Sequence, residues 1–211
     1  MIREGDSWVR YVPKVEAKVG GAVSPDGAEQ IQCDFPGQYH MRNTGGMGPR
    51  GPGSGDGLCV FTSIEHSAIH QNVPELIGFQ KWMMRKPGGG YPEKVDAMID
   101  QFCKERGLAK PNYIQVQGPD LEVIRLACKT GRMPAVTYGV SPSGRYGGQR
   151  ILHMVNAPHG SQAWFAVLDN NYIEPREGAY EWLSPQEFSR AYGSGWSVIL
   201  LAPPPPPVPT N

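Results

Sequence analysis

The sequence has no excess charge of either sign. Its 211 residues include 20 Lys and Arg and 20 Asp and Glu, so the net charge is zero. Runs of like charge are also missing, and no long-range field favours a nucleic acid or an anionic membrane as a partner. No apolar run is long enough to cross a bilayer, and no charged-then-apolar leader follows Met1. We therefore expect a soluble protein, with the cytoplasm as the favoured compartment.

Cysteine is scarce and widely spaced. The four cysteines are Cys33, Cys59, Cys103 and Cys128, and no two of them form a CxxC pair. This number excludes a disulfide scaffold, and the spacing excludes the common zinc sites. We expect a reducing compartment, no bound metal and no cofactor.

Glycine and proline, in contrast, are abundant, with 27 and 21 copies, and they gather in residues 45–57 and in the C-terminal tail. Residues 45–57 are expected to be loop throughout. Residues 1–30 show little periodicity and predict an N-terminal arm. Residues 31–202 predict one domain. Residues 203–211 form a proline-rich tail, which is typical of a linker or of a peptide that docks on a partner.

The hydrophobic periodicity changes from helical to strand-like along the domain. Helices are expected from residue 58 over about three turns, at 74–85, at 92–106 and at 121–130. Strands are expected at 113–117, 135–140, 151–156, 163–168 and 196–202. Ser184-Pro185-Gln186-Glu187 is a capping box that starts one more helix. Helices first and strands later predict an α+β fold.

Cys59 is the first candidate for chemistry. It stands at the predicted start of a helix, directly after the glycine-rich loop. A helix N-terminus favours a thiolate, and glycine allows a substrate to approach the main chain closely. The alternative is a small buried apolar residue, which is the usual role of a cysteine.

His153 is the second candidate, because it interrupts the apolar strand Ile151–Val155. A buried imidazole needs hydrogen-bond partners, and two of them are near at hand in the sequence. Asp169 and Asn170 end the next apolar strand, and antiparallel pairing would bring them close to His153. Nucleophile, base and orienting residue would then form a thiol triad, whereas the alternative is a structural histidine.

Three segments resemble papain-like cysteine peptidases. Cys59–Glu65 (CVFTSIE) is similar to the start of the central helix of that family. Gly89-Gly90-Tyr91-Pro92 is similar to one wall of its substrate cleft, and Trp164–Asn171 resembles the strand that leads to its triad Asn. The order Cys, His, Asn also agrees, and the whole sequence resembles a group of bacterial proteins of planctomycete type.

The resemblance implies a papain-like fold, in which a helical half packs on an antiparallel sheet half and the active-site cleft lies between them. It implies a cysteine peptidase or amidase acting on a peptide or protein substrate, with Cys59 as nucleophile and His153 as base. In the family pattern the orienting residue lies two places after the last hydrophobic residue of the strand. This position selects Asn170 over Asp169.

The same resemblance assigns Gly89, Gly90 and Tyr91 to substrate binding. The family usually has a Gln six residues before the nucleophile, as an oxyanion donor, but here that position is Gly53. A replacement donor could come from Asn43 or Gln38.

Two rival functions remain open at this point. The missing Gln fits an inactive papain-like binding module, whereas Asp169 as the orienting residue would fit a transglutaminase-type acyl transferase. His66 and His70 are spaced four residues apart on the Cys59 helix, a spacing that can bind metal. Without a third ligand, we expect them to be packed or solvent-facing residues.

Overall fold

The structure is a computed structural model, and it describes residues 21–43, 57–142, 144–172, 180–193 and 195–203, together with the backbone of 2–4, 7–9, 47–48 and 51–52. Most of the predicted arm and of the proline-rich tail lies outside these residues. Within them, no helix combines the length and the apolar character needed to cross a membrane.

Five α-helices are described: α1 (Leu58–His70), α2 (Phe79–Met83), α3 (Pro92–Glu105), α4 (Leu121–Lys129) and α5 (Pro185–Tyr192). Two short 3₁₀ helices, η1 (Gly37–Tyr39) and η2 (Pro74–Leu76), accompany them. The predicted starts of α1, α3, α4 and α5 are confirmed. The side chains of Asp120 and Ser184 cap α4 and α5, as their sequences indicated.

The expected continuous helix over residues 74–85 is wrong, because the chain breaks into η2 and α2 at Gly78. Gly78 has a φ of 87°, which lies outside helical geometry. The buried carboxylate of Glu65 accepts hydrogen bonds from the main-chain N–H groups of Gly78 and Gln80, at 2.6 and 2.7 Å. Burial raises the pKa of Glu65, and its carboxyl oxygens satisfy helix-start donors that would otherwise stay unpaired.

The main sheet has six strands in the order β5-β10-β6-β7-β8-β9, and all neighbours are antiparallel. They are β5 (Tyr113–Gln117), β6 (Ala135–Tyr138), β7 (His153–Gly160), β8 (Phe165–Leu168), β9 (Tyr180–Leu183) and β10 (Trp196–Leu200). Five of the six match predicted strands, and β9 was missed. The α+β class is therefore confirmed.

Two short hairpins lie outside the main sheet: β1 (Ile2–Glu4) pairs with β2 (Ser7–Val9), and β3 (Met47–Gly48) pairs with β4 (Gly51–Pro52). The second hairpin falls in residues 45–57, where only loop was expected. Two-residue strands leave no alternation of polar and apolar residues in the sequence from which they could be recognised.

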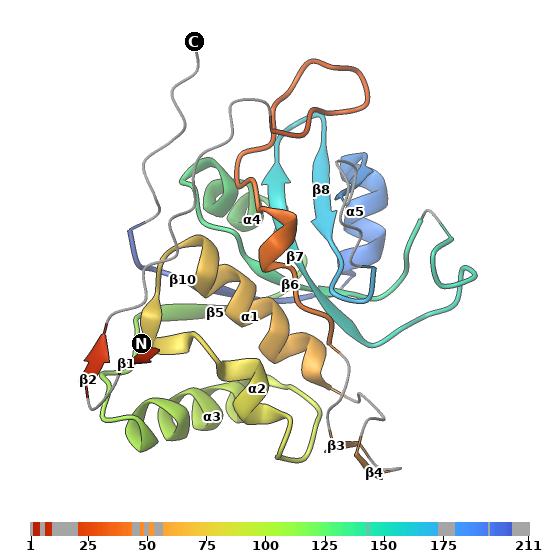
Figure 1. Cartoon of the computed structure of the whole chain (residues 1–211). Coiled ribbons are helices and arrows are strands. Elements are labelled where there is room, and N and C mark those ends of the chain that lie inside the picture. The colour runs from red at the N-terminus through yellow and green to blue at the C-terminus, as the bar shows by residue number, and fades with distance from the viewer. Residues whose placement is uncertain are drawn as a thin grey trace.

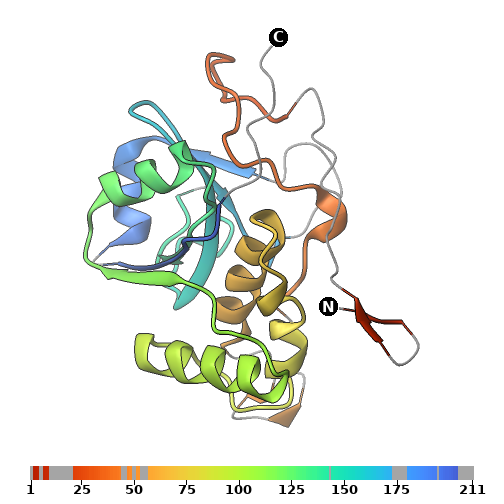
Figure 2. The same ribbon diagram turned by 90° about the vertical axis from the view of Figure 1, so that its left-hand side faces the viewer.

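Helices cover both faces of the main sheet (Figure 1, Figure 2). Successive residues of a strand point to opposite faces, and β7 illustrates this rule. Met154 belongs to the core that contains α1, α2 and α3, whereas Val155 belongs to the core that contains α4 and α5. The chain thus forms a layer of three helices, a sheet, and a layer of two helices.

Helix α1 is buried along its whole length, and its contact with β7 is polar. The hydroxyl of Ser63 donates to the carbonyl of Met154 at 3.1 Å. The amide of Asn156 donates to the Ser63 carbonyl and to the Ser67 hydroxyl, at 2.9 and 3.0 Å. Buried polar groups are costly unless they are paired, and these bonds fix the position of the helix along the strand.

The described end of the predicted arm packs on the sheet. Glu29 lies 2.7 Å from the Nε2 atom of His159 on β7, and Asp26 accepts a hydrogen bond from the indole of Trp164 at 3.0 Å. Residues 21–30 therefore contact the domain.

Candidate active site

Cys59 is the second residue of α1, and glycines shape the main chain around it. Gly57 caps the helix start with a φ of 80°, and no side chain caps the first N–H groups. A Cβ atom on Gly57 would lie 1.6 Å from the main-chain nitrogen of Gly89. The chain segment after α2 therefore packs directly on the turn that presents Cys59, which only glycine permits.

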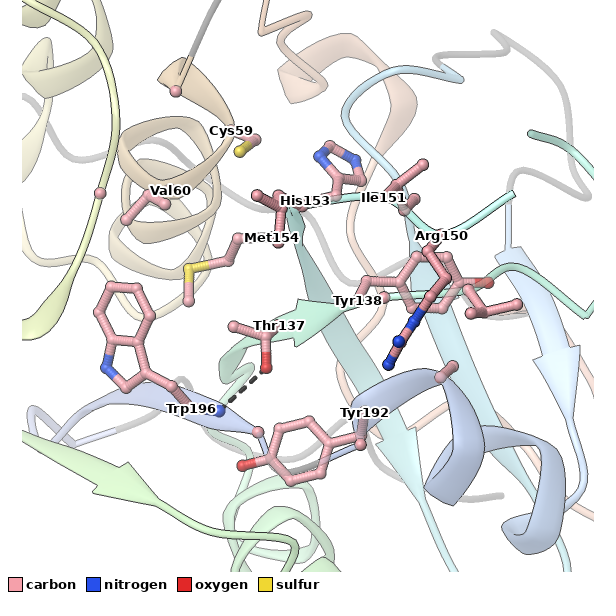
Figure 3. Close-up of a pocket in the computed structure, with 18 of the residues that line it drawn as sticks. Cys59, Val60, Thr137, Tyr138, Arg150, Ile151, His153, Met154, Tyr192 and Trp196 are labelled. Atoms are coloured by element: carbon pink, nitrogen blue, oxygen red, sulfur yellow. Dashed lines mark hydrogen bonds between the residues drawn. The ribbon is translucent and has the colours of Figure 1, made fainter. Parts of the chain in front are cut away.

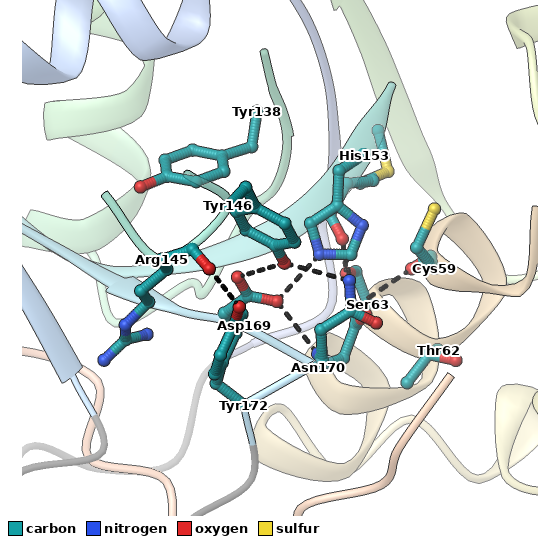
Figure 4. Close-up of polar contacts among 12 residues, drawn as sticks. Cys59, Thr62, Ser63, Tyr138, Arg145, Tyr146, His153, Asp169, Asn170 and Tyr172 are labelled. Atoms are coloured by element: carbon teal, nitrogen blue, oxygen red, sulfur yellow. Dashed lines mark hydrogen bonds and ion pairs between the residues drawn. The ribbon is translucent and has the colours of Figure 1, made fainter. Parts of the chain in front are cut away.

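His153, the first residue of β7, faces Cys59 on one side and Asp169 on the other (Figure 4). Its Nε2 atom lies 2.7 Å from Oδ1 of Asp169, so Nε2–H donates to the carboxylate. The other ring nitrogen faces the sulfur of Cys59, and the two side chains interact. Asp169 directly follows β8, the antiparallel neighbour of β7. The predicted meeting of these two strand ends is confirmed.

These contacts change the proton affinity of the ring. Burial alone would lower the pKa of His153, but its hydrogen bonds with Asp169 and Cys59 outweigh burial and raise the pKa to about 9. Burial would raise the pKa of Asp169, yet the bond to His153 and those from Asn171 and Tyr146 hold it below its usual range. The ring is therefore positively charged at neutral pH.

Tyr146 completes the surroundings of Asp169, and no pattern in the sequence predicted this contact. Its hydroxyl donates to Oδ2 of Asp169 at 2.7 Å and accepts a hydrogen bond from the side chain of Asn171 at 2.9 Å. The ring meets His153 edge-on, with 5.9 Å between centroids. Tyr146 lies in the irregular segment between β6 and β7, and its hydrogen bond holds the carboxylate that faces His153.

The selection of Asn170 as the orienting residue is wrong. Its side-chain amide donates to the Ser63 hydroxyl and the Met154 carbonyl, both at 2.9 Å, and to the Cys59 carbonyl at 3.3 Å. Asn170 thus ties α1 to β7 beneath the candidate site (Figure 4). The adjacent Asp169 points the other way, to His153.

Cys59 and His153 line a pocket of about 1050 Å³, and Gly89 and Gly90 form part of the same wall. Figure 3 shows the side chains of Cys59 and His153 at one end of this pocket. Tyr91 does not join them, because it is exposed and lines a separate depression formed with α3. Of the three residues expected to bind substrate, two are brought to Cys59 and one is not.

Neither expected oxyanion side chain is brought to the pocket. Gln38 is exposed on η1. Asn43 is buried nearer the site, where its main-chain N–H donates to the Asn170 carbonyl at 3.2 Å, but it does not line the pocket. Gly53, the position at which the family has Gln, lies outside the described residues. The donors at the described helix start are therefore main-chain N–H groups.

The paired histidines of α1 are packed rather than solvent-facing. The Nε2 atom of His66 accepts from the main-chain N–H of Met41 at 2.9 Å, and its Nδ1 lies 3.2 Å from Asn156. His70 lies 3.0 Å from the carbonyl of Gly131. In the described part of the chain, no three His, Cys, Asp or Glu side chains are grouped so that they could hold a metal ion.

Like Cys59, the other three cysteines are buried thiols. Burial raises the pKa of Cys33 to about 12 and raises the pKa values of Cys103 and Cys128 as well. None of the three lines the pocket. The arrangement around Cys59 is the one that suits nucleophilic catalysis, because it combines a thiol with a charged, oriented imidazole at the wall of an open pocket.

Comparison with known proteins adds no assignment to this geometry. No family model, no curated protein and no solved structure matches the chain.

Proposed function

We propose that the protein is a thiol hydrolase, a cysteine peptidase or amidase that cleaves a peptide-like substrate. The observation that carries the proposal is the position of the His153 ring. It lies between the Cys59 sulfur and the Asp169 carboxylate, and both Cys59 and His153 line the pocket. A structural histidine would need partners too, but it would not need a thiol on its second nitrogen at the wall of a pocket.

The reaction follows from these positions. The Cys59 thiolate attacks the substrate carbonyl, and a sulfur–carbon bond forms while the main-chain N–H of Cys59 stabilises the oxyanion. The imidazolium of His153 gives its proton to the leaving amine as the carbon–nitrogen bond breaks. Neutral His153 then takes a proton from water, which attacks the thioester and releases the acid. Asp169 holds the ring in place and stabilises its charged form.

A papain-like architecture is part of the proposal. Support comes from a thiol at the start of a buried helix, an imidazole on an antiparallel sheet, and a glycine wall beside them. Peptides or proteins are the proposed substrates, and the proline-rich tail is a proposed docking segment for a partner.

Hydrolysis of fluorescein-labelled casein and of p-nitrophenyl esters tests the proposal. We expect turnover by the native chain and at least about a thousandfold loss in Cys59→Ala and in His153→Ala, as for other thiol and serine hydrolases. Cys103→Ala, which removes a thiol outside the pocket, is the matched control and should retain activity. Turnover that survives in Cys59→Ala, or no turnover by the native chain, would sink the proposal.

Acyl transfer is a second candidate, and one observation favours it. Asp169, rather than Asn170, lies on the His153 ring, and an orienting Asp was the feature expected of a transglutaminase-type enzyme. In that reaction an amine instead of water would attack the thioester. Adding monodansylcadaverine to the casein assay distinguishes the two, because transfer gives a fluorescent casein conjugate and hydrolysis gives shorter peptides. An inactive binding module would give neither product.

A further inference from the structure

The permanently charged side chains that line the pocket beside Cys59 are all of one sign. Among the described residues that line it, Arg150 and Arg190 are the side chains with a permanent charge, and none is Asp or Glu. His153 is charged as well, since hydrogen bonds raise its pKa to about 9, but Asp169 and Cys59 already face that charge. For a chain of zero net charge, this is a local imbalance.

The two arginines are both exposed and come from different segments of the chain. Arg150 lies three residues before His153, and Arg190 lies in the last turn of α5. Within the part of the chain that the structure describes, neither guanidinium makes a hydrogen bond or an ion pair. The electrostatic partner of Arg190 is Glu187, whose carboxylate is already bound by the Ser184 hydroxyl and main-chain N–H.

One of these two arginines, Arg150, points into the pocket. Figure 3 shows the Arg150 side chain extending into the pocket toward Tyr192, on the side away from Cys59. Apolar side chains, among them Val60, Met154 and Trp196, also line the pocket. Low-dielectric walls focus the field of a charge, so an anion in this space is attracted more strongly than one on the open surface.

Two carboxylates bond to residues that line the pocket, and both are already engaged. Glu181 is buried and accepts hydrogen bonds from Tyr138 at 2.5 Å and from Ser141 at 3.0 Å. Asp169 is paired with His153. Neither lines the pocket. A planar guanidinium matches a carboxylate with two parallel hydrogen bonds, and an arginine without a protein partner in a pocket is suited to that ligand.

We propose that the pocket binds a peptide substrate with a carboxylate at the end of the pocket away from the bond that Cys59 attacks, and that Arg150 and Arg190 hold this carboxylate. The inference rests on the thiol hydrolase function proposed above and adds its substrate class. The carboxylate can be an Asp or Glu side chain or the C-terminus of the peptide, and both present the same group to the arginines.

Equilibrium binding to the Cys59→Ala variant tests this inference without any need for turnover. The probes are short alanine-based peptides with a neutral dye, in three forms: one internal Glu with an amidated C-terminus, its Gln twin, and an all-alanine peptide with a free carboxylate. We expect the Glu peptide, the free-acid peptide or both to bind about tenfold more tightly than the Gln twin at low salt. The form that gains affinity identifies the source of the carboxylate.

Substitutions connect the preference to the pocket. Arg150→Gln and Arg190→Gln, each added to Cys59→Ala, should each remove most of the preference. Arg85→Gln removes the same charge from an exposed position outside the pocket and should leave it intact. Equal binding of all three peptides, absence of binding, or an equal effect of Arg85→Gln would overturn the inference.

Turnover by the native chain separates the two proposals. Hydrolysis of Glu and Gln peptides at equal rates, with equal binding, overturns the carboxylate inference and leaves the hydrolase intact. A tenfold binding preference without any hydrolysis supports the carboxylate site and contradicts the hydrolase.

Discussion

Replacing Asp169 with Asn changes one charge in the candidate site and almost no volume. The amide oxygen of Asn can still accept the Nε2–H hydrogen bond of His153, which is 2.7 Å long in the native chain. What the ring loses is the negative charge beside it. The change therefore separates the electrostatic role of Asp169 from its role in positioning the ring.

The size of the effect follows from the pKa of His153. Burial opposes the charged ring, and the bonds to Asp169 and Cys59 raise the pKa to about 9. An ordinary histidine titrates near about 6.5, and a tenfold change in proton affinity is worth about 1.4 kcal/mol, so the charged ring is favoured by roughly 3 kcal/mol. With the carboxylate gone, burial dominates, and we expect the pKa of His153 to fall by about two or more.

The free energy of unfolding should also depend on the charges of His153 and Asp169. A pKa that is higher in the folded than in the unfolded chain contributes stability below about pH 6.5, and this contribution is lost as the pH rises toward 9. The native chain should therefore lose up to about 3 kcal/mol of its free energy of unfolding over this window. In Asp169→Asn the loss should be largely absent.

Nuclear magnetic resonance of the histidine rings measures the pKa directly. The chain has five histidines, and the missing signal in His153→Gln assigns the one of interest. We expect a titration near pH 9 in the native chain and below about pH 7 in Asp169→Asn. If His153 keeps its native pKa in Asp169→Asn, the carboxylate does not set the charge of the ring and the reasoning is refuted.

Further predictions concern residues that pack around Cys59 and His153 or on helix α1. Asn170→Ala removes three hydrogen bonds that the Asn170 amide donates, two to α1 and one to β7, and should lower the free energy of unfolding in urea by about 2–4 kcal/mol; a change below about 0.5 kcal/mol would contradict the role given to Asn170. Gly90→Ala would put a Cβ 2.5 Å from the side chain of Val60; it should lower turnover more than stability, and unchanged kinetics would show that this wall is not critical. Burial lowers the pKa of His66 to about 3, so the unfolded chain binds more protons below about pH 6.5 and stability should fall as the pH drops from there toward 3; a urea midpoint that is flat from pH 6.5 to 4 would contradict this. Tyr146→Phe leaves Oδ2 of Asp169 without its tyrosine donor and should raise the pKa of Asp169, which that bond lowers; an unchanged pH–rate profile would refute a positioning role.

The candidate nucleophile and base could be predicted because each has an unusual local sequence context. Cys59 follows a glycine-rich loop at a helix start, and His153 interrupts an apolar strand. The choice between Asp169 and Asn170 could not be made from the sequence. The chain turns directly after β8, so these neighbours point to opposite sides of the sheet end, one toward His153 and one toward α1. Which of them meets the ring depends on this turn.

Tyr146 was missed for a related reason. It reaches Asp169 across 23 residues from a segment without periodicity, and local pattern carries no information on such a contact. The secondary structure shows the same difference between features that local sequence reveals and features that depend on distant contacts. Capped helix starts such as that at Ser184 are visible in the sequence, whereas the break at Gly78 depends on the buried carboxylate of Glu65.

The relative rates at which iodoacetamide alkylates the cysteines at pH 7 test most directly whether Cys59 and His153 work as one unit. We predict that Cys59 reacts at least about tenfold faster than Cys103 or Cys128, since an imidazolium beside a sulfur favours the reactive thiolate and burial raises the pKa values of the other two thiols. His153→Ala should abolish most of this advantage while leaving the slow thiols unchanged. Equal and slow alkylation of all cysteines in the native chain would contradict the account.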